Sequence, residues 1–204
     1  MTEGRDRLLR ASVEHFAAHG IGDASLRSIA TAIGTSHRML IYHFGSRDGL
    51  LAEVVRTVEA QQRDLLVTLA DSTLPVTEQA EQFWRRVTEA TLVYGPLFFE
   101  LSAQAMQGKP HTEALRAELI HIWLPPLTAL CIRSGVDPVE APLYARLGLA
   151  ASRGLLFDLL LTGDRTEVDA ASALLNNLFA ASLTHGEGRA HRHPEAAART
   201  HPIR

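Results

Sequence analysis

The sequence contains little of the chemistry that stabilises small secreted proteins or holds metal ions. Among its 204 residues, Cys131 is the only cysteine and Lys109 is the only lysine. A single cysteine excludes an intrachain disulfide framework and a zinc site made of several thiolates. No phosphate-binding loop, dinucleotide-binding glycine pattern or His-Glu-x-x-His motif is present. We therefore expect no metal, no cofactor and no enzymatic activity.

Long apolar runs are also missing. Residues 1–6 are polar and do not form a secretory signal. The longest uncharged apolar stretch, residues 119–132, is too short to cross a bilayer and contains Pro125 and Pro126. The sequence therefore predicts a cytoplasmic protein without a membrane segment.

What the sequence does contain is the composition of a folded helical protein. Apolar residues make up 46% of the chain and charged residues 21%, which is typical of globular proteins. Apolar side chains recur every three or four positions, and no segment shows the alternation of a half-buried strand. We predict an all-α fold. Three short helices with tight glycine turns occupy the first fifty residues, and a fourth helix runs from Asp48 to about Leu69.

A larger helical region follows, and the same periodicity gives its helices. They are expected at residues 78–94, 97–107, 112–134, 138–162 and 166–183, with a break at Gly95-Pro96. The double proline at Pro125-Pro126 should bend or split the third of these. We place domain boundaries at 1–48, 49–184 and 185–204. The last segment is rich in histidine and arginine and is predicted to be a disordered tail.

The charge of the chain is unevenly distributed. The formal net charge of −3 by itself gives no sign of a nucleic-acid partner. Yet residues 25–47 carry three arginines (Arg27, Arg38 and Arg47) and no acid. Two short helices joined by a glycine-containing turn, the second polar and basic, form the helix-turn-helix pattern of DNA-binding proteins. A helical bundle with a solvated arginine face would show the same charges, and the charge pattern alone does not separate the two interpretations.

Several short motifs between residues 6 and 55 carry more specific information. They are Asp6-Arg7-Leu8-Leu9, Phe16, Gly20, Leu26-Arg27-Ser28-Ile29-Ala30, Gly34-Thr35-Ser36 and Tyr42-His43-Phe44-Gly45-Ser46-Arg47-Asp48-Gly49-Leu50-Leu51. In these motifs and their spacing the chain resembles the TetR family of transcriptional regulators. The resemblance implies an N-terminal helix-turn-helix domain, followed by a larger helical domain that binds a small molecule and forms a homodimer.

The resemblance also implies which side chains contact an operator in double-stranded DNA. Ser25 and Arg27 would bind backbone phosphates, and Ser36, His37 and Arg38 would lie against base edges. The remaining implied contacts are made by Thr35, Tyr42, His43 and Arg47. Two positions depart from the family pattern: the usual tyrosine falls at Ile41, with Tyr42 one place later, and the usually small residue at position 38 is arginine.

The larger region offers a candidate ligand pocket. Aromatic side chains are concentrated in its first half, next to the bend expected at the double proline, and aromatic-lined space between helices is a common small-molecule site. The candidate lining residues are Trp84, Tyr94, Phe98, Phe99, Met106, His121 and Trp123. They favour an apolar or aromatic effector over a sugar or nucleotide. For any single residue, an ordinary core position is the alternative interpretation.

The last two predicted helices, within about 138–183, carry apolar stripes. Such helices form the dimer interface of the family, although part of each stripe must belong to the core of the monomer. The sequence thus predicts a ligand-responsive DNA-binding regulator, a repressor released by its effector. The alternative is a small-molecule-binding helical protein without a functional operator.

Overall fold

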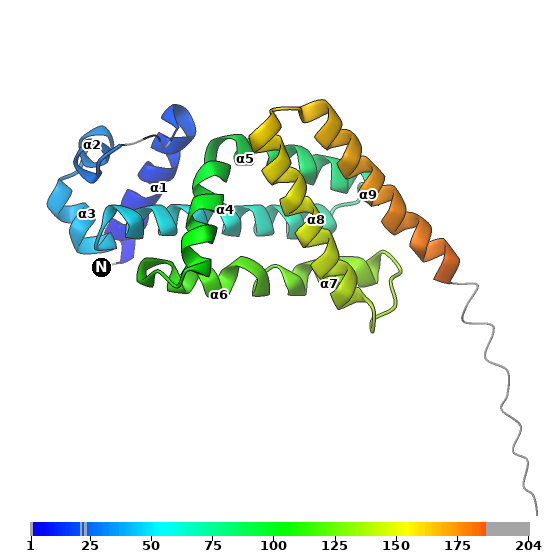
Figure 1. Ribbon diagram of the computed structural model, residues 1–204. Helices are drawn as coiled ribbons and strands as arrows, with labels where there is room; N and C mark the ends of the chain where they lie inside the picture. Colours follow the sequence, from blue (N-terminus) through cyan, green and yellow to red (C-terminus); the bar gives the residue numbers. More distant parts are fainter. Residues whose placement is uncertain (1, 21, 23, 187–204) are drawn as a thin grey trace, which may run out of the picture.

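The computed structural model describes residues 2–20, 22 and 24–186, and these residues form helices without any strand (Figure 1). The prediction of an all-α fold is confirmed. The elements are α1 (Thr2–His19), α2 (Leu26–Ala32), α3 (His37–Phe44), α4 (Arg47–Ala70), α5 (Val76–Met106), the 3₁₀ turn η1 (Pro110–Thr112), α6 (Glu113–His121), α7 (Leu124–Arg133), α8 (Ala141–Thr162) and α9 (Arg165–Gly186). The part of the predicted tail from residue 187 onward lies outside the described residues.

Local sequence signals account for the short N-terminal helices. Ser25, Ser36 and Ser46 cap α2, α3 and α4, and each hydroxyl accepts a hydrogen bond from a backbone N–H in the first turn. Gly34 and Gly45 end the preceding helices with φ of 70° and 74°, a backbone region that residues with a side chain rarely adopt. Caps and glycines together fix the turns, so this part of the fold matches the sequence prediction closely.

One core joins the N-terminal helices to the larger region. Phe16 of α1, Leu40 of α3 and Leu50 of α4 are fully buried in the same cluster as Leu101 of α5. Figure 1 shows α4 running from the N-terminal helices across the middle of the molecule, with α6 and α7 below it in this view. The helix α4 therefore connects the N-terminal helices to the larger region. Its N-terminal half packs in the shared core, and its C-terminal half lies within the larger region.

The predicted break at Gly95-Pro96 is wrong, since α5 continues through both residues. A Cβ atom at Gly95 would lie 2.7 Å from Leu160 Cδ1 of α8, so the glycine allows close helix packing. Figure 1 shows that α5 bends sharply along its length without ending. Pro96 removes one backbone hydrogen bond from the helix. The apolar contacts on both sides of this position, including buried Leu97, hold α5 together across it.

The prediction that the double proline splits residues 112–134 is confirmed, although the break precedes the prolines. It falls at Ile122 and Trp123, between α6 and α7, and Pro125 and Pro126 lie in the first turn of α7. A proline there costs little, because the first-turn N–H groups have no partner within the helix. By length and hydropathy alone, 110–133 could span a membrane, and only 12% of its apolar window is buried. One such segment is weak evidence for a membrane span, and Trp123 within it is buried in the helical core.

The helices α8 and α9 differ slightly from the predicted ranges. The helix α8 begins at Ala141 instead of residue 138, and α9 ends at Gly186 instead of residue 183. The first two residues of the segment predicted as a tail, His185 and Gly186, therefore belong to α9. The two helices are joined at Gly163, whose φ of 71° ends α8.

Candidate functional site: the helix-turn-helix surface and an aromatic cavity

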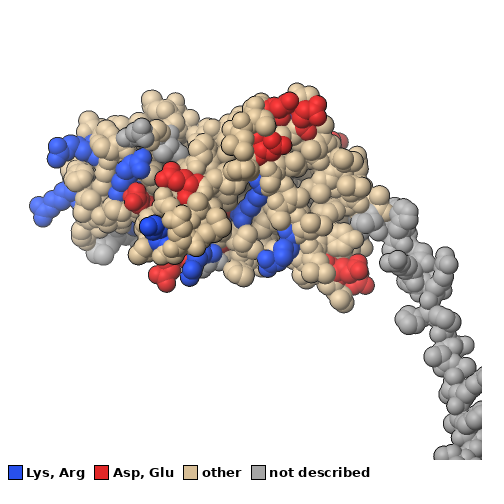
Figure 2. All heavy atoms as spheres, viewed as in Figure 1, with Lys and Arg blue, Asp and Glu red and all other residues tan. Residues whose placement is uncertain are grey.

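The outward surface of α2 and α3 is polar and basic. Arg27 on α2 and His37 and Arg38 at the start of α3 are exposed, and no acid lies between residues 25 and 47. In Figure 2, basic side chains project from the end of the molecule that α2 and α3 form in Figure 1, while acidic side chains gather near the connection of α8 and α9. The surface therefore combines positive charge with donors that suit phosphate and base oxygens.

The hydroxyl-bearing residues of this surface also hold the helices in place. Ser25 Oγ accepts a hydrogen bond from the N–H of Ser28 at 3.1 Å, and Ser36 Oγ accepts one from the N–H of Met39 at 3.2 Å. The backbone N–H of Thr35 donates to the carbonyl of Ala30 at 2.8 Å and closes the turn. The Ser25 and Ser28 hydroxyls also lie 3.1 Å apart, whereas the Ser36 hydroxyl keeps a proton that it can donate to a phosphate.

The face of α3 continues with side chains that are partly apolar. Tyr42 is 64% exposed, and its ring meets His43 edge-on at 4.9 Å between centroids. Met39 and Ile41 are about two-fifths exposed, and the sequence analysis did not include Met39 among the candidate contacts. An exposed methionine on the second helix of such a motif can contact a thymine methyl group, as apolar side chains do in the major groove.

Arg47 makes structural contacts that the sequence analysis did not predict. Its Nε donates to the carbonyl of Ala24 at 2.8 Å, and its Nη2 donates to the carbonyl of Gly22 at 3.2 Å. Both carbonyls lie in the turn between α1 and α2, whereas Arg47 begins α4. The side chain thus fastens the helix-turn-helix to the start of α4, in addition to any phosphate contact.

Replacing Arg47 by alanine should therefore destabilise the protein by about 1 to 2 kcal/mol, because two carbonyls lose a charged donor. Arg47→Lys should restore only part of the lost stability, since an ammonium group lacks the planar fork of N–H donors that reaches both carbonyls. Urea denaturation measures the change. Arg27→Ala is the matched control, because Arg27 is exposed, and it should shift stability by less than about 0.5 kcal/mol. Equal effects of the two variants would contradict the fastening role.

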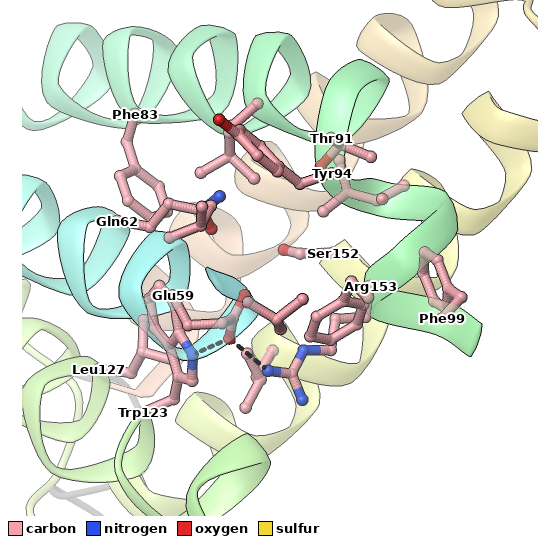
Figure 3. A pocket seen from close by; sticks show the side chains of 18 of the residues that line it. Glu59, Gln62, Phe83, Thr91, Tyr94, Phe99, Trp123, Leu127, Ser152 and Arg153 are labelled. Atoms are coloured by element: carbon pink, nitrogen blue, oxygen red, sulfur yellow. Dashed lines mark hydrogen bonds and ion pairs between the residues drawn. The ribbon is translucent and has the colours of Figure 1, made fainter. Parts of the chain in front are cut away.

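A cavity of about 100 Å³ lies between α4, α5 and α8 and is closed on one side by Trp123 and α7 (Figure 3). Most of its lining is apolar or aromatic. The lining residues are Val55, Val58, Glu59, Gln62, Phe83, Val87, Ala90, Thr91, Tyr94, Gly95, Phe98, Phe99, Trp123, Leu127, Gly148, Leu149, Ser152, Arg153 and Leu156. An engineered apolar cavity of about 150 Å³ binds benzene, so this space suits at most one aromatic ring without rearrangement.

Four of the seven predicted pocket residues line this cavity: Tyr94, Phe98, Phe99 and Trp123. The other three lie elsewhere. Trp84 Nε1 donates to Asp169 Oδ1 of α9 at 2.7 Å, Met106 is 81% exposed at the end of α5, and His121 is exposed at the end of α6. Residue type had suggested these three, but the side of the helix on which each falls directs it away from the cavity.

The cavity contains a charged cluster that the sequence analysis missed. Glu59 Oε2 accepts hydrogen bonds from Trp123 Nε1 at 2.7 Å and from Arg153 Nη2 at 3.2 Å. The Glu59 and Arg153 side chains are 14% and 18% exposed. Burial raises the pKa of the Glu59 carboxyl, and the charge of Arg153 and the indole N–H oppose the rise. A single acid within an apolar stripe (Val55, Val58, Glu59) was the available signal in the sequence.

The cavity is connected to the N-terminal helices by a buried hydroxyl. Tyr94 lines the cavity with its ring, and its hydroxyl donates to the carbonyl of Val13 in α1 at 2.8 Å. Burial raises the pKa of this phenol, so it stays protonated and remains a donor. Tyr94 thus joins the cavity lining to α1 through one hydrogen bond.

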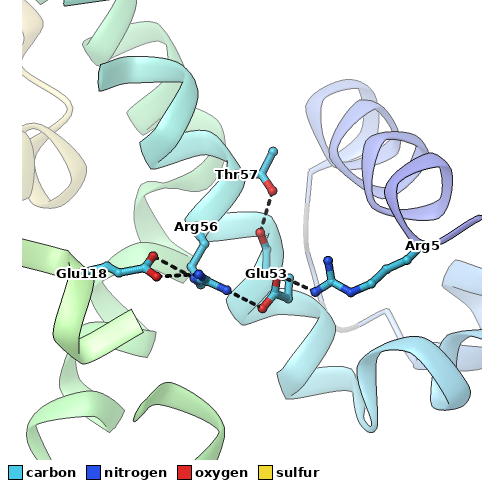
Figure 4. Close-up of polar contacts among 5 residues, drawn as sticks. All are labelled: Arg5, Glu53, Arg56, Thr57 and Glu118. Atoms are coloured by element: carbon cyan, nitrogen blue, oxygen red, sulfur yellow. Dashed lines mark hydrogen bonds and ion pairs between the residues drawn. The ribbon is translucent and has the colours of Figure 1, made fainter. Parts of the chain in front are cut away.

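A chain of ion pairs makes a second connection on the opposite side of α4 (Figure 4). Arg56 Nε donates to Glu118 Oε2 of α6 at 2.8 Å, and Arg56 Nη1 donates to Glu53 Oε1 at 2.8 Å. Glu53 Oε2 in turn lies 2.7 Å from Arg5 Nη2 of α1. The hydrogen bond from Arg56 lowers the pKa of Glu118. These side chains link α6 to α1 through α4.

Comparison with known proteins agrees with this arrangement. Residues 8–54 match the family model described as "Bacterial regulatory proteins, tetR family". The curated "HTH-type transcriptional regulatory protein RaaS" of Mycobacterium tuberculosis (strain ATCC 25618 / H37Rv) is 41% identical over an alignment of 61 residues, and the match covers 26% of this chain. The matched segment spans only 28% of the length of that relative.

Solved structures extend the similarity in fold to most of the chain. A putative transcriptional regulator from Rhodococcus sp. RHA1 has a TM-score of 0.67 and 22% identity, over 86% of this chain and 95% of its own. The multidrug binding protein EbrR, solved in complex with imidazole, has a TM-score of 0.59 and 22% identity, over 87% of this chain and 90% of its own. The match to a family of regulatory proteins also agrees with the expectation that the chain is not an enzyme. The N-terminal helices thus match the model of the tetR family over residues 8–54, and most of the chain shares the fold of these solved structures.

Proposed function

We propose that the protein is a cytoplasmic, homodimeric DNA-binding transcriptional regulator, a repressor released when a small aromatic molecule enters the cavity. The observation that carries the proposal is the exposed, acid-free surface of α2 and α3 in a segment that matches the family model. The EbrR relative is named as a multidrug binding protein, which supports a binding role for the cavity of this chain.

In the proposed complex, α3 enters the major groove and α2 crosses the phosphate backbone. Arg38, exposed in the first turn of α3, is placed to form a bidentate hydrogen bond with a guanine, the commonest specific contact of such helices. Arg27 on α2 and Tyr42 and His43 in the last turn of α3 would contact phosphates. Ser36 and His37 begin α3 and would face the bases.

The proposed dimer uses α8 and α9. Their outward faces carry large apolar side chains that no other part of the described chain covers. These exposed residues are Leu143, Leu147, Phe157, Leu161, Leu174 and Leu178. Gly154 lies in the same stripe of α8, and a Cβ atom there would meet nothing within 4 Å, which allows a partner helix to approach closely. Because operator half-sites are related by two-fold symmetry, a second copy of the chain is the fitting occupant.

Some residues of α8 and α9 are buried within the monomer and cannot contribute to a dimer interface. Val168 is only 1% exposed, and Ser152 lines the cavity, so neither is available to a partner chain.

Release from DNA would follow from a shift between two arrangements of the dimer. A ligand in the cavity touches α4, α5 and α8 at once, and α4 carries the helix-turn-helix at its N-terminal end. To release DNA, the ligand must bind the released arrangement more tightly than the DNA-bound one. Tyr94 supplies a direct link from the cavity to α1, and the Arg5-Glu53-Arg56-Glu118 chain links α6 and α4 to α1.

Selection from a random-sequence DNA pool tests the DNA-binding proposal. The wild-type protein should enrich a two-fold symmetric site, and Arg38→Ala should relax base preference at one position of each half-site, at a cost of about 1 to 3 kcal/mol in discrimination. Arg86→Ala on α5 is the control, since Arg86 is exposed far from α3, and it should leave the site unchanged. Failure to enrich any sequence would favour a small-molecule-binding protein without an operator.

Replacing Tyr94 by phenylalanine should weaken the link between the cavity and α1. The variant keeps the aromatic ring of the cavity but leaves the Val13 carbonyl without its donor, at an expected cost of about 1 kcal/mol in stability. Comparison of operator affinity with and without a bound ligand should show a smaller ratio than in the wild type. Thr91→Val, which changes a different polar group of the lining, should leave that ratio unchanged.

A further inference from the structure

The two oxygens of the Glu59 carboxylate differ, because only one of them accepts hydrogen bonds from protein donors among the described residues. Oε2 accepts from both Trp123 Nε1 and Arg153 Nη2. Within the described part of the chain, no protein donor hydrogen-bonds to Oε1. In Figure 3 this oxygen points away from both donors, toward the side of the cavity where Gln62 and Ser152 lie.

The surroundings of Glu59 determine the charge of a molecule that binds there. The Arg153 guanidinium pairs with Glu59 and also lies 5.1 Å from the centroid of the Phe98 ring. A second guanidinium, that of Arg63, lies 5.7 Å from the centroid of the Trp123 ring. Two cations therefore stand near one carboxylate, and a cationic ligand would meet more positive than negative charge. An anionic ligand would be repelled by the negatively charged Oε1 of Glu59.

The remaining class is a neutral molecule that donates a hydrogen bond. We propose that the cavity is a site for small neutral aromatic compounds bearing an O–H or N–H group, with the ring against the apolar lining beside Glu59 and the donor on Glu59 Oε1. This inference rests on the proposed function of the cavity as the effector site and names the chemistry of the effector. A hydrogen bond to an ionised acceptor is about twice as strong as one between neutral groups, so the donor provides most of the selectivity.

The size of the cavity supports a single ring. Its volume is about 100 Å³, and its aromatic walls present edges and faces to a flat guest: the Phe83 and Trp123 rings meet at 63°, and the Phe98 and Phe99 rings at 89°. Offset and edge-to-face contacts are the favoured arrangements of aromatic pairs.

Calorimetric titration of the wild-type protein with four probes of similar size tests the inference. Phenol donates a hydrogen bond and is neutral, toluene has no donor, benzylamine is a cation and benzoate is an anion. Phenol should bind about 10- to 100-fold more tightly than toluene, and also more tightly than benzylamine and benzoate. Equal affinity for phenol and toluene, or a preference for either charged probe, would overturn the proposal.

The two tryptophans locate the bound probe. Trp123 donates to Glu59, whereas Trp84 donates to Asp169 outside the cavity lining. Phenol should shift the indole N–H resonance of Trp123 and leave that of Trp84 in place. Binding that shifts only Trp84, or neither resonance, would place the probe elsewhere and refute the assignment.

Two variants separate the carboxylate from the cavity itself. Glu59→Gln should remove most of the advantage of phenol over toluene while toluene still binds, because an amide is a weaker acceptor than a carboxylate. Ser152→Leu should fill the space and abolish binding of both probes. If Glu59→Gln does not fold, the wild-type probe series still decides the question.

The outcome is independent of the DNA experiments. A protein that selects an operator but binds phenol and toluene equally keeps the proposed function and loses this inference. A protein that prefers phenol but selects no operator shows the opposite result.

Discussion

Replacing Leu147 by glutamate is expected to convert the protein from a dimer to a monomer and to lower its affinity for the selected DNA site by roughly 100-fold or more. Leu147 is 58% exposed at the centre of the apolar stripe on α8. In a dimer its side chain would be buried against the partner, and burying an unpaired carboxylate there is strongly unfavourable. The loss of DNA affinity follows because two half-sites are bound together only while the two subunits are joined. Sedimentation velocity and fluorescence anisotropy measure the two effects.

A matched control distinguishes this effect from a general effect of added charge. Leu92 on α5 is also exposed, at 52%, and lies outside the α8 and α9 stripes. Leu92→Glu should remain dimeric with wild-type affinity for DNA. If Leu147→Glu also stays dimeric, α8 does not form the interface, and the apolar stripe needs another explanation.

Replacing Glu59 by leucine should destabilise the protein by about 3 to 5 kcal/mol. The change leaves the Arg153 guanidinium in a site where its side chain is only 18% exposed, and removing one partner of a buried ion pair carries this cost because the other charge remains without compensation. The indole N–H of Trp123 loses its acceptor in the same variant. Chemical denaturation measures the difference.

The double variant Glu59→Leu with Arg153→Leu provides the test of this explanation. Since both charges are then removed, stability should return to within about 1 to 2 kcal/mol of the wild type, as apolar replacements of buried ion pairs often do. If the double variant is as unstable as the sum of the single variants, the two residues act independently and the cavity does not depend on their pairing.

Features of the fold that depend on residues close together in the chain could be predicted from the sequence. Ser36 and Gly45 mark the ends of α3 because a cap and a left-handed glycine act within one turn. The same reasoning failed at Gly95, where the decisive contact is with Leu160, a residue that the sequence does not place beside it. Periodicity could not reveal that α5 continues, since the glycine is required by packing between helices.

The cavity was predicted only in part for the same reason. Phe98 and Phe99 were found by residue type, but the pairing of Glu59 with Arg153 joins positions 94 residues apart. Glu59 falls within an apolar stripe of α4, but no local pattern identifies Arg153 as its partner. The role of Arg47 was also hidden, because its partners are backbone carbonyls that carry no signal in the sequence.

Sequence-specific binding of DNA by α3 is the property on which the proposed function depends most. The direct measurement compares the affinity of the wild-type protein for its selected site and for a scrambled site of the same length, over a series of salt concentrations. We expect the selected site to bind at least about 1,000-fold more tightly at physiological salt, and both affinities to fall steeply as salt rises. Equal affinity for the two sites would contradict a role of α3 in reading DNA sequence.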